Sequence, residues 1–156
     1  MSGADVEAAA GGDWRSLGRW AIESRPGNER EAIECVRDGL RNVSLAHNRF
    51  EALMTAVGEA TMNAMEHGNG YQPDVPVQVE AFLANHAVMV RITDQGGPFT
   101  LTETDAPNLE AKLSGLQSPR GWGLFLIERL VDEARVINEG AEHAIALIMR
   151  LDGQSS

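Results

Sequence analysis

Two polar side chains of one predicted helix have the types and the spacing that a shared ligand would need. Glu59 and Asn63 lie four residues apart in the stretch 48–67, which stacks a carboxylate and an amide on the same helix face. Such a pair suits ligand binding or acid–base chemistry, but it is also what an ordinary solvated helix face shows. Its meaning depends on what the rest of the chain brings near it.

A second candidate, Asp94, lies at the end of a predicted strand. It continues the alternation of Val90 and Ile92, so we expect it on the buried face, where a carboxylate is costly unless it meets a donor. That donor is either a backbone amide of the next turn or the amine of a ligand. Gly96 and Gly97 follow directly, and they would allow a close backbone approach that side chains prevent.

A third candidate is the glycine-rich start of the last predicted helix. Gly121-Trp122-Gly123 precedes the run from Leu124 to Asp132, which is predicted to be helical. Free amides and the helix dipole at such a start favour phosphate, although a G-x-G before a helix is as often a packing device.

The helix that carries Glu59 and Asn63 is expected from Asn48 to His67, with Gly68 as its C-terminal stop. Asn48 and Glu51 resemble a capping box at its start. A helical wheel gathers an apolar stripe on one side, formed by Phe50, Leu53, Met54, Val57, Thr61 and Ala64. It places three polar residues opposite: Glu59, Asn63 and Glu66.

The remaining elements predict a two-layer α/β sandwich, with a mostly antiparallel mixed sheet covered on one face by three helices. Strands are expected at 19–24, 75–82, 87–94, 134–138 and 143–151, and the second and third of them form a hairpin. A helix is expected from Asn28 to about Asn42, and another from Gly121. Residues 98–120 contain no convincing element, and a loop this long in a compact domain is typical of a lid or binding loop, or else a tolerated surface insertion.

Composition excludes several classes of function. The chain of 156 residues is 43% hydrophobic and carries a formal charge of −10, which argues against direct binding of nucleic acid or an anionic membrane. Lys112 is the sole lysine, and no P-loop pattern exists. Cys35 has no partner for an internal disulfide and fits a small buried apolar role.

The same length and composition predict one domain at 14–152, with a disordered N-terminal tail at 1–13 and a C-terminal tail at 153–156. No cleavable signal peptide and no apolar run near the roughly 20 residues of a membrane span are visible. A cytoplasmic protein is therefore expected.

Taken together, the three candidates resemble the three boxes of the ATP-binding superfamily of gyrases, histidine kinases and mismatch-repair ATPases (the Bergerat fold). The chain is most similar to one branch, the bacterial anti-sigma factor serine/threonine kinases, also called switch-protein kinases. The segment from Glu59 to Gly68 resembles the pattern E-A-x-x-N-A-x-x-H-G of that branch. Residues 94–99 resemble D-x-G-x-P-F, and residues 120–127 resemble R-G-x-G-L-F-L-I. The resemblance spans about 17–152; Pro98 replaces a second glycine of the wider superfamily, as is common in this branch.

The resemblance implies a role for each matching residue. Asn63 would coordinate the Mg²⁺ that bridges the phosphates of ATP, Glu59 would be the general base, and Asp94 would accept a hydrogen bond from the adenine amine. His67 would support the loop after the helix, and Arg120 would neutralise phosphate charge. The residues expected to contact ATP are Asn63, His67, Asp94, Gly96, Gly97, Arg120, Gly121, Trp122, Gly123 and Leu124.

Two functions remain open on the sequence. The first is an anti-sigma factor kinase that binds Mg-ATP, phosphorylates a serine of a STAS-type anti-sigma antagonist and sequesters a sigma factor, with the homodimer usual in that family. The second is an ATP-binding module that sequesters its partner with little or no kinase activity. The catalytic half of a histidine kinase is disfavoured, because no helical hairpin carries a phosphoacceptor histidine and His47 lies in a connecting loop.

Overall fold

The computed structural model describes residues 14–95, 119–139 and 142–151. For residues 119–123, 138–139 and 142 it describes the backbone alone. The predicted tails at 1–13 and 153–156 and nearly all of the predicted lid fall outside these ranges. Along the chain the elements are β1 (Arg15–Ile22), α2 (Glu29–Gly39), α3 (His47–Asn63), the π-helical turn η1 (Ala64–Gly68), β2 (Val77–Leu83), β3 (Ala87–Asp94), α5 (Pro119–Leu130), β4 (Glu133–Glu139) and β5 (Glu142–Arg150).

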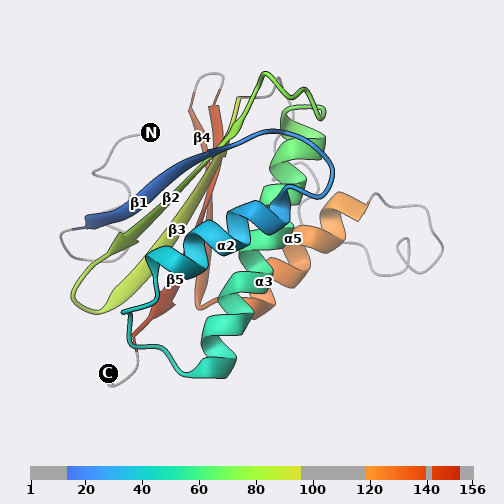
Figure 1. Cartoon of the computed structure of the whole chain (residues 1–156). Helices are drawn as coiled ribbons and strands as arrows, with labels where there is room; N and C mark the ends of the chain where they lie inside the picture. Colours follow the sequence, from blue (N-terminus) through green and yellow to red (C-terminus); the bar gives the residue numbers. More distant parts are fainter. Residues whose placement is uncertain (1–13, 96–118, 140–141, 152–156) are drawn as a thin grey trace.

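The five described strands form one sheet in the order β1-β2-β3-β5-β4. All four pairings of neighbouring strands are antiparallel, so the mixed character expected of the sheet does not occur in this part of the chain. Helices α2, α3 and α5 lie together on one face of this sheet (Figure 1). The two-layer α/β sandwich predicted from the sequence is therefore confirmed.

Alternate positions of the inner strands build the core between the two layers. The side chains that face the helices are almost wholly buried: Val77, Val79 and Ala81 of β2, Val88, Val90 and Ile92 of β3, and Ile145, Leu147 and Met149 of β5. Strand β3 has the predicted bounds and the predicted parity. As a result Asp94, its last residue, points to the helix side of the sheet.

Helix α3 is the central element of the helical layer, because it contacts α2, α5 and the sheet. The apolar stripe predicted from the wheel is buried except for Phe50, which is partly buried. Four residues on other sides of the helix are buried as well: Ala56, Gly58, Ala60 and Asn63. Asn63, predicted on the side opposite this stripe, is buried as well and lines a pocket. Of the three residues predicted to lie on that side, Glu59 is partly exposed and Glu66 is exposed.

The predicted capping box at the start of α3 does not form. The helix begins at His47 with Ala46 as its N-cap and no side-chain cap. Glu51 instead binds the guanidinium of Arg37 on α2, with N···O distances of 2.7 and 3.3 Å. A salt bridge between two helices therefore replaces the local cap.

Several boundaries differ from the sequence-based ones by a few residues. Strand β1 begins four residues before the predicted start, and α2 ends at Gly39 instead of near 42. Helix α5 begins at Pro119, because proline fits the first turn of a helix, whereas the prediction treated it as a breaker within the lid. Arg120 and Gly121 therefore belong to the first turn of this helix. Among the described helices, none is long and apolar enough to cross a membrane.

Candidate functional site

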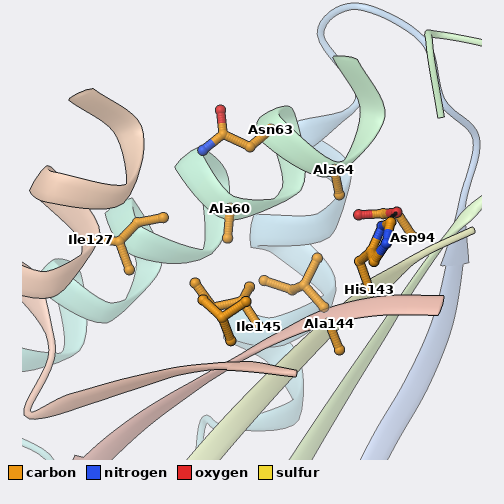
Figure 2. Close-up of a pocket in the computed structure, with 10 residues that line it drawn as sticks. Ala60, Asn63, Ala64, Asp94, Ile127, His143, Ala144 and Ile145 are labelled. Carbon is orange, nitrogen blue, oxygen red and sulfur yellow. Dashed lines mark ion pairs between the residues drawn. The ribbon is translucent and has the colours of Figure 1, made fainter. Parts of the chain in front are cut away.

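A small pocket, with a cavity volume of about 20 Å³, lies between the end of α3 and the sheet. Figure 2 shows its polar residues at separate places: Asn63 on the helix side, and Asp94 beside His143 at the sheet. The remaining lining residues are apolar: Ala60, Ala64, Ile92, Ile127, Val136, Ala144 and Ile145. A mostly apolar wall with a few polar groups is typical of a site for a small molecule with an aromatic part.

Asp94 is held at the base of this pocket by its neighbours. Its backbone is paired with His143 across β3 and β5, and both side chains are 9% exposed. Gly68 of η1 lies directly against the carboxylate, since a Cβ at this glycine would be 2.5 and 2.6 Å from the two carboxylate oxygens. Gly68 is therefore needed for the space it leaves to Asp94, in addition to its position at the end of the helix.

Asn69 fixes the loop that follows Gly68. Its backbone N–H donates to the Ala64 carbonyl at 2.9 Å, which closes the wide π-helical turn. Its side-chain amide donates to the Ser24 hydroxyl and the Val75 carbonyl, and its Oδ1 accepts from the backbone N–H of Gln95 at 3.0 Å. The residue after Asp94 is therefore attached to the same loop that supplies Gly68.

Asn63 is the last residue of α3 and is 7% exposed. Its side-chain nitrogen is buried and has no hydrogen-bond partner among the described residues. A buried amide nitrogen in this state has a donor available for a ligand. The structure thus brings Asn63 and Asp94 to one pocket, although they are 31 positions apart in the sequence.

Three other predicted site residues do not line this pocket: Glu59, His67 and Leu124. Glu59 lies one helical turn before Asn63, half-buried, and is not in the pocket lining. His67 lies in η1, lines a separate polar cavity beside Gln95, and has its Nε2 3.5 Å from the carboxylate of Glu66. Leu124 is buried in the core.

The predicted glycine-rich segments lie only partly within the described residues. Arg120, Gly121, Trp122 and Gly123 lie in the first turns of α5, and only their backbone is described. Gly96 and Gly97 fall outside the described residues. Their predicted contacts with ATP therefore stay predictions.

The sequence-based reasoning missed His143. This residue lies at the start of β5 with the parity of Ile145 and Leu147, so the alternation that placed Asp94 on the buried face also places His143 there. Its Nδ1 is 3.3 Å from Asp94 Oδ1 but forms no hydrogen bond. The signal was therefore present in the strand pattern.

The donor set fits a nucleotide with a bridging metal ion better than a metal held by protein alone. In the described part of the chain no group of three or more His, Cys, Asp or Glu residues could hold a metal ion. Asn63 supplies one amide, and Mg²⁺ commonly binds through one or two protein groups together with phosphates and waters. The apolar lining suits a base, and the carboxylate of Asp94 suits an amine.

Comparisons with known proteins identify the family of the chain. Residues 22–150 match the family model described as the histidine kinase-like ATPase domain. The serine-protein kinase RsbW of Bacillus subtilis (strain 168) is 26% identical over 140 residues, which are 85% of this chain and 87% of that protein. RsbW of Listeria monocytogenes serotype 4a (strain HCC23) is 29% identical over 130 residues, covering 80% of this chain and 72% of that protein.

Two solved structures share the fold. One contains the RsbU and RsbW domains of a Mycobacterium tuberculosis protein, with a TM-score of 0.61 and 24% identity; it covers 86% of this chain, which spans only 32% of that longer one. The other is the SiaB–SiaC complex of Pseudomonas aeruginosa, with a TM-score of 0.59, 17% identity, and coverage of 94% and 95% of the two chains. The chain therefore belongs to the histidine kinase-like ATPase domain family, where its relatives are serine-protein kinases, as the three motifs indicated.

Proposed function

We propose that the protein is a cytoplasmic anti-sigma factor kinase that binds Mg-ATP between α3 and the sheet. It would transfer a phosphoryl group to a serine of a STAS-type antagonist protein and sequester a sigma factor. The observation that supports this most is the shared pocket of Asn63 and Asp94. These are two buried polar groups of different chemistry in an otherwise apolar lining.

The base end of the nucleotide is assigned to Asp94. A buried carboxylate is stabilised when it accepts a charge-assisted hydrogen bond, and the exocyclic amine of adenine supplies one. Ile92, Ile127 and Ile145 line the adjacent walls, where they would contact the faces of a flat ring and exclude water.

The phosphate end is assigned to Asn63 and the start of α5. Figure 1 shows that α5 begins at the same end of the molecule at which α3 ends, and the two helices are in contact. The N-terminus of α5 offers free backbone amides and a positive dipole, and Arg120 lies in its first turn. A bound Mg²⁺ would neutralise phosphate charge next to Asn63. With Lys112 as the sole lysine, the helix amides, Arg120 and this ion would supply most of the positive field.

Glu59 is assigned as the general base. It lies one turn from Asn63 on the same helix and is partly exposed, so a protein substrate can reach it. In the proposed step the serine oxygen forms a bond to the γ-phosphorus, the bond from that phosphorus to the bridging oxygen breaks, and ADP leaves. The serine proton passes to Glu59.

Partner switching is supported by the relatives. RsbW proteins are named as serine-protein kinases, and SiaB was solved in complex with SiaC. The formal charge of −10 is compatible with a basic surface on a partner. We also propose that the protein forms a homodimer, because the chain resembles a kinase branch in which homodimers are usual.

The test is transfer of label from γ-labelled Mg-ATP to proteins in a soluble lysate of the source organism, using wild type, Glu59→Gln and Glu34→Gln. Glu34 is an exposed carboxylate on α2, remote from the pocket, and serves as the matched control. Wild type and Glu34→Gln should label one small protein on serine, and Glu59→Gln should not. If wild type binds ATP but labels nothing, the sequestering module becomes the better description.

A further inference from the structure

We propose that Asn69 is a positioning residue of the nucleotide site. Its side chain fixes the backbone at Gln95 and so holds the Asp94 carboxylate where it meets the adenine amine. This inference rests on the proposed binding of ATP at Asp94. It concerns a residue outside the three sequence motifs, at the C-terminal end of η1.

Two consecutive residues of this loop hold two consecutive residues at the end of β3. Gly68 lies against the Asp94 carboxylate, since an added Cβ would be 2.5 and 2.6 Å from its two oxygens. Asn69 Oδ1 accepts a hydrogen bond from the backbone N–H of Gln95 at 3.0 Å. Together these contacts restrain both the carboxylate of Asp94 and the peptide that follows it.

The Asn69 side chain is itself firmly anchored. It is 5% exposed, and its Nδ2 donates to the Ser24 hydroxyl at 3.1 Å and to the Val75 carbonyl at 2.9 Å. These partners belong to the connections that precede α2 and β2, and the β1–α2 connection lies beside the end of α3 (Figure 1). The amide nitrogen therefore binds two loops of the fold, and the amide oxygen binds Gln95.

The hydrogen bond to Gln95 does more than satisfy a polar group. Gln95 is an exposed residue, so water could bind its N–H if the Asn69 side chain were absent. What water could not supply is a fixed position, because it is not attached to the rest of the fold. A binding group that is held in place before the ligand arrives saves the cost of ordering it on binding. The bond therefore matters for nucleotide affinity.

Ser24 provides a matched control within the same network. It is wholly buried, its hydroxyl donates to the Val75 carbonyl at 2.6 Å, and it accepts from Asn69. After Ser24→Ala, the Asn69 amide still binds Val75 and Gln95. If Asn69 acts on stability alone, both substitutions should affect ligand binding in the same way. A positioning role predicts that binding of the adenine amine weakens only when the bond to Gln95 is lost.

The experiment measures dissociation constants by calorimetry for the magnesium complexes of ATP and of purine ribonucleoside triphosphate, which lacks the amine. Wild type should prefer ATP by roughly tenfold or more, as expected for a hydrogen bond to a charged group. Asn69→Ala should bind ATP about three- to tenfold more weakly and bind the analogue as wild type does. Its preference for ATP should therefore shrink by the same factor.

Two further variants separate this effect from a loss of stability. Ser24→Ala should melt roughly 2–4 °C lower than wild type but keep the wild-type preference for ATP. Asn69→Asp loses the donors to Ser24 and Val75 but keeps an oxygen that accepts from Gln95. It should also keep the preference, and its added charge acts equally on two ligands that carry the same triphosphate.

The outcomes distinguish the positioning role from the site itself. The role of Asn69 is overturned if Asn69→Ala keeps the wild-type preference, or if it weakens both ligands equally. It is also overturned if Ser24→Ala or Asn69→Asp loses the preference. No binding of either ligand to folded wild-type protein would instead reject the ATP site, and equal binding of both would reject the contact of Asp94 with the amine. If melting shows that Asn69→Ala does not fold, Asn69→Asp and Ser24→Ala decide the question.

Discussion

Replacing Gly68 with alanine should weaken the proposed contact between Asp94 and the adenine ring through a single added methyl group. A Cβ at this position would lie 2.5 and 2.6 Å from the carboxylate oxygens of Asp94. A normal contact needs about 3.5 Å, so the carboxylate must retreat by roughly 1 Å. A shift of that size would remove the hydrogen bond that we propose between Asp94 and the adenine amine.

The magnitude follows from the kind of hydrogen bond that is lost. A hydrogen bond to a charged group contributes about 1.5–3 kcal/mol, so ATP should bind roughly 10- to 150-fold more weakly to Gly68→Ala. The added methyl group should also destabilise the fold by about 1–3 kcal/mol through crowding. Calorimetric titration with Mg-ATP and a urea denaturation curve measure the two effects separately.

Gly58→Ala is the matched control for this experiment. It adds the same methyl group to α3, where the Cβ would meet only the flexible end of Ile33 at 2.9 Å. Its affinity for ATP should stay within about twofold of wild type, because Ile33 can rotate away from the added methyl group.

A double-mutant cycle isolates the contact between Gly68 and Asp94. In an Asp94→Ala background the carboxylate is already absent, so Gly68→Ala should cost no further affinity. The reasoning is refuted if folded Gly68→Ala binds ATP as tightly as wild type. It is also refuted if the losses in the cycle simply add.

Three further predictions concern stability. Asp132 accepts from Arg49 and from the backbone N–H of Arg150 at 2.9 and 2.7 Å; burial alone would raise its pKa, but these hydrogen bonds lower it. The ionised Asp132 carboxylate therefore stabilises the folded protein above its ordinary pKa of about 3.9, and this stabilisation is lost as the pH falls through its lower pKa in the folded state. Asp132→Asn should therefore lower the free energy of unfolding in urea by about 1–2 kcal/mol at pH 7 and by nearly nothing at pH 2. Asn69→Ala removes two donors and the acceptor for Gln95 N–H, and should lower the unfolding free energy by about 1–3 kcal/mol; an unchanged urea midpoint would contradict this. Leu147→Ala leaves a cavity at a wholly buried position of β5 and should cost about 2–5 kcal/mol, and a loss below about 1 kcal/mol would show that the core is not packed there as described.

The strand pattern carried most of the information that the sequence held about the site. Period-two alternation located β3 with its correct ends and placed Asp94 on the buried face. The same rule applied to β5 would have placed His143 beside it. What alternation could not provide was the register of β3 against β5, which brings the two residues into contact across the sheet.

The helical layer was less predictable because its central helix is buried on several sides. A wheel assumes one buried face, but Ala56, Gly58 and Ala60 let neighbouring elements approach α3 elsewhere. The wheel placed Asn63 opposite the apolar stripe, but it did not predict that Asn63 would be buried in a pocket. The motif, and not the periodicity, indicated its importance.

Two local features depend on contacts between distant segments. The π-helical turn at 64–68 is closed by a hydrogen bond from Asn69, whose side chain also binds Ser24 and the backbone after Asp94. Glu51 resembled part of a capping box, but Arg37 of the preceding helix competes for its carboxylate. Single-sequence reasoning has no access to such long-range partners.

The central claim is that Asp94 and Asn63 mark the two ends of one ATP site. A crystal structure of the protein with Mg²⁺ and a non-hydrolysable ATP analogue tests it most directly. The account predicts the adenine amine within hydrogen-bond distance of Asp94, and a Mg²⁺ ion bound by Asn63 and phosphate oxygens. A nucleotide bound elsewhere, or a base that faces away from Asp94, would contradict it.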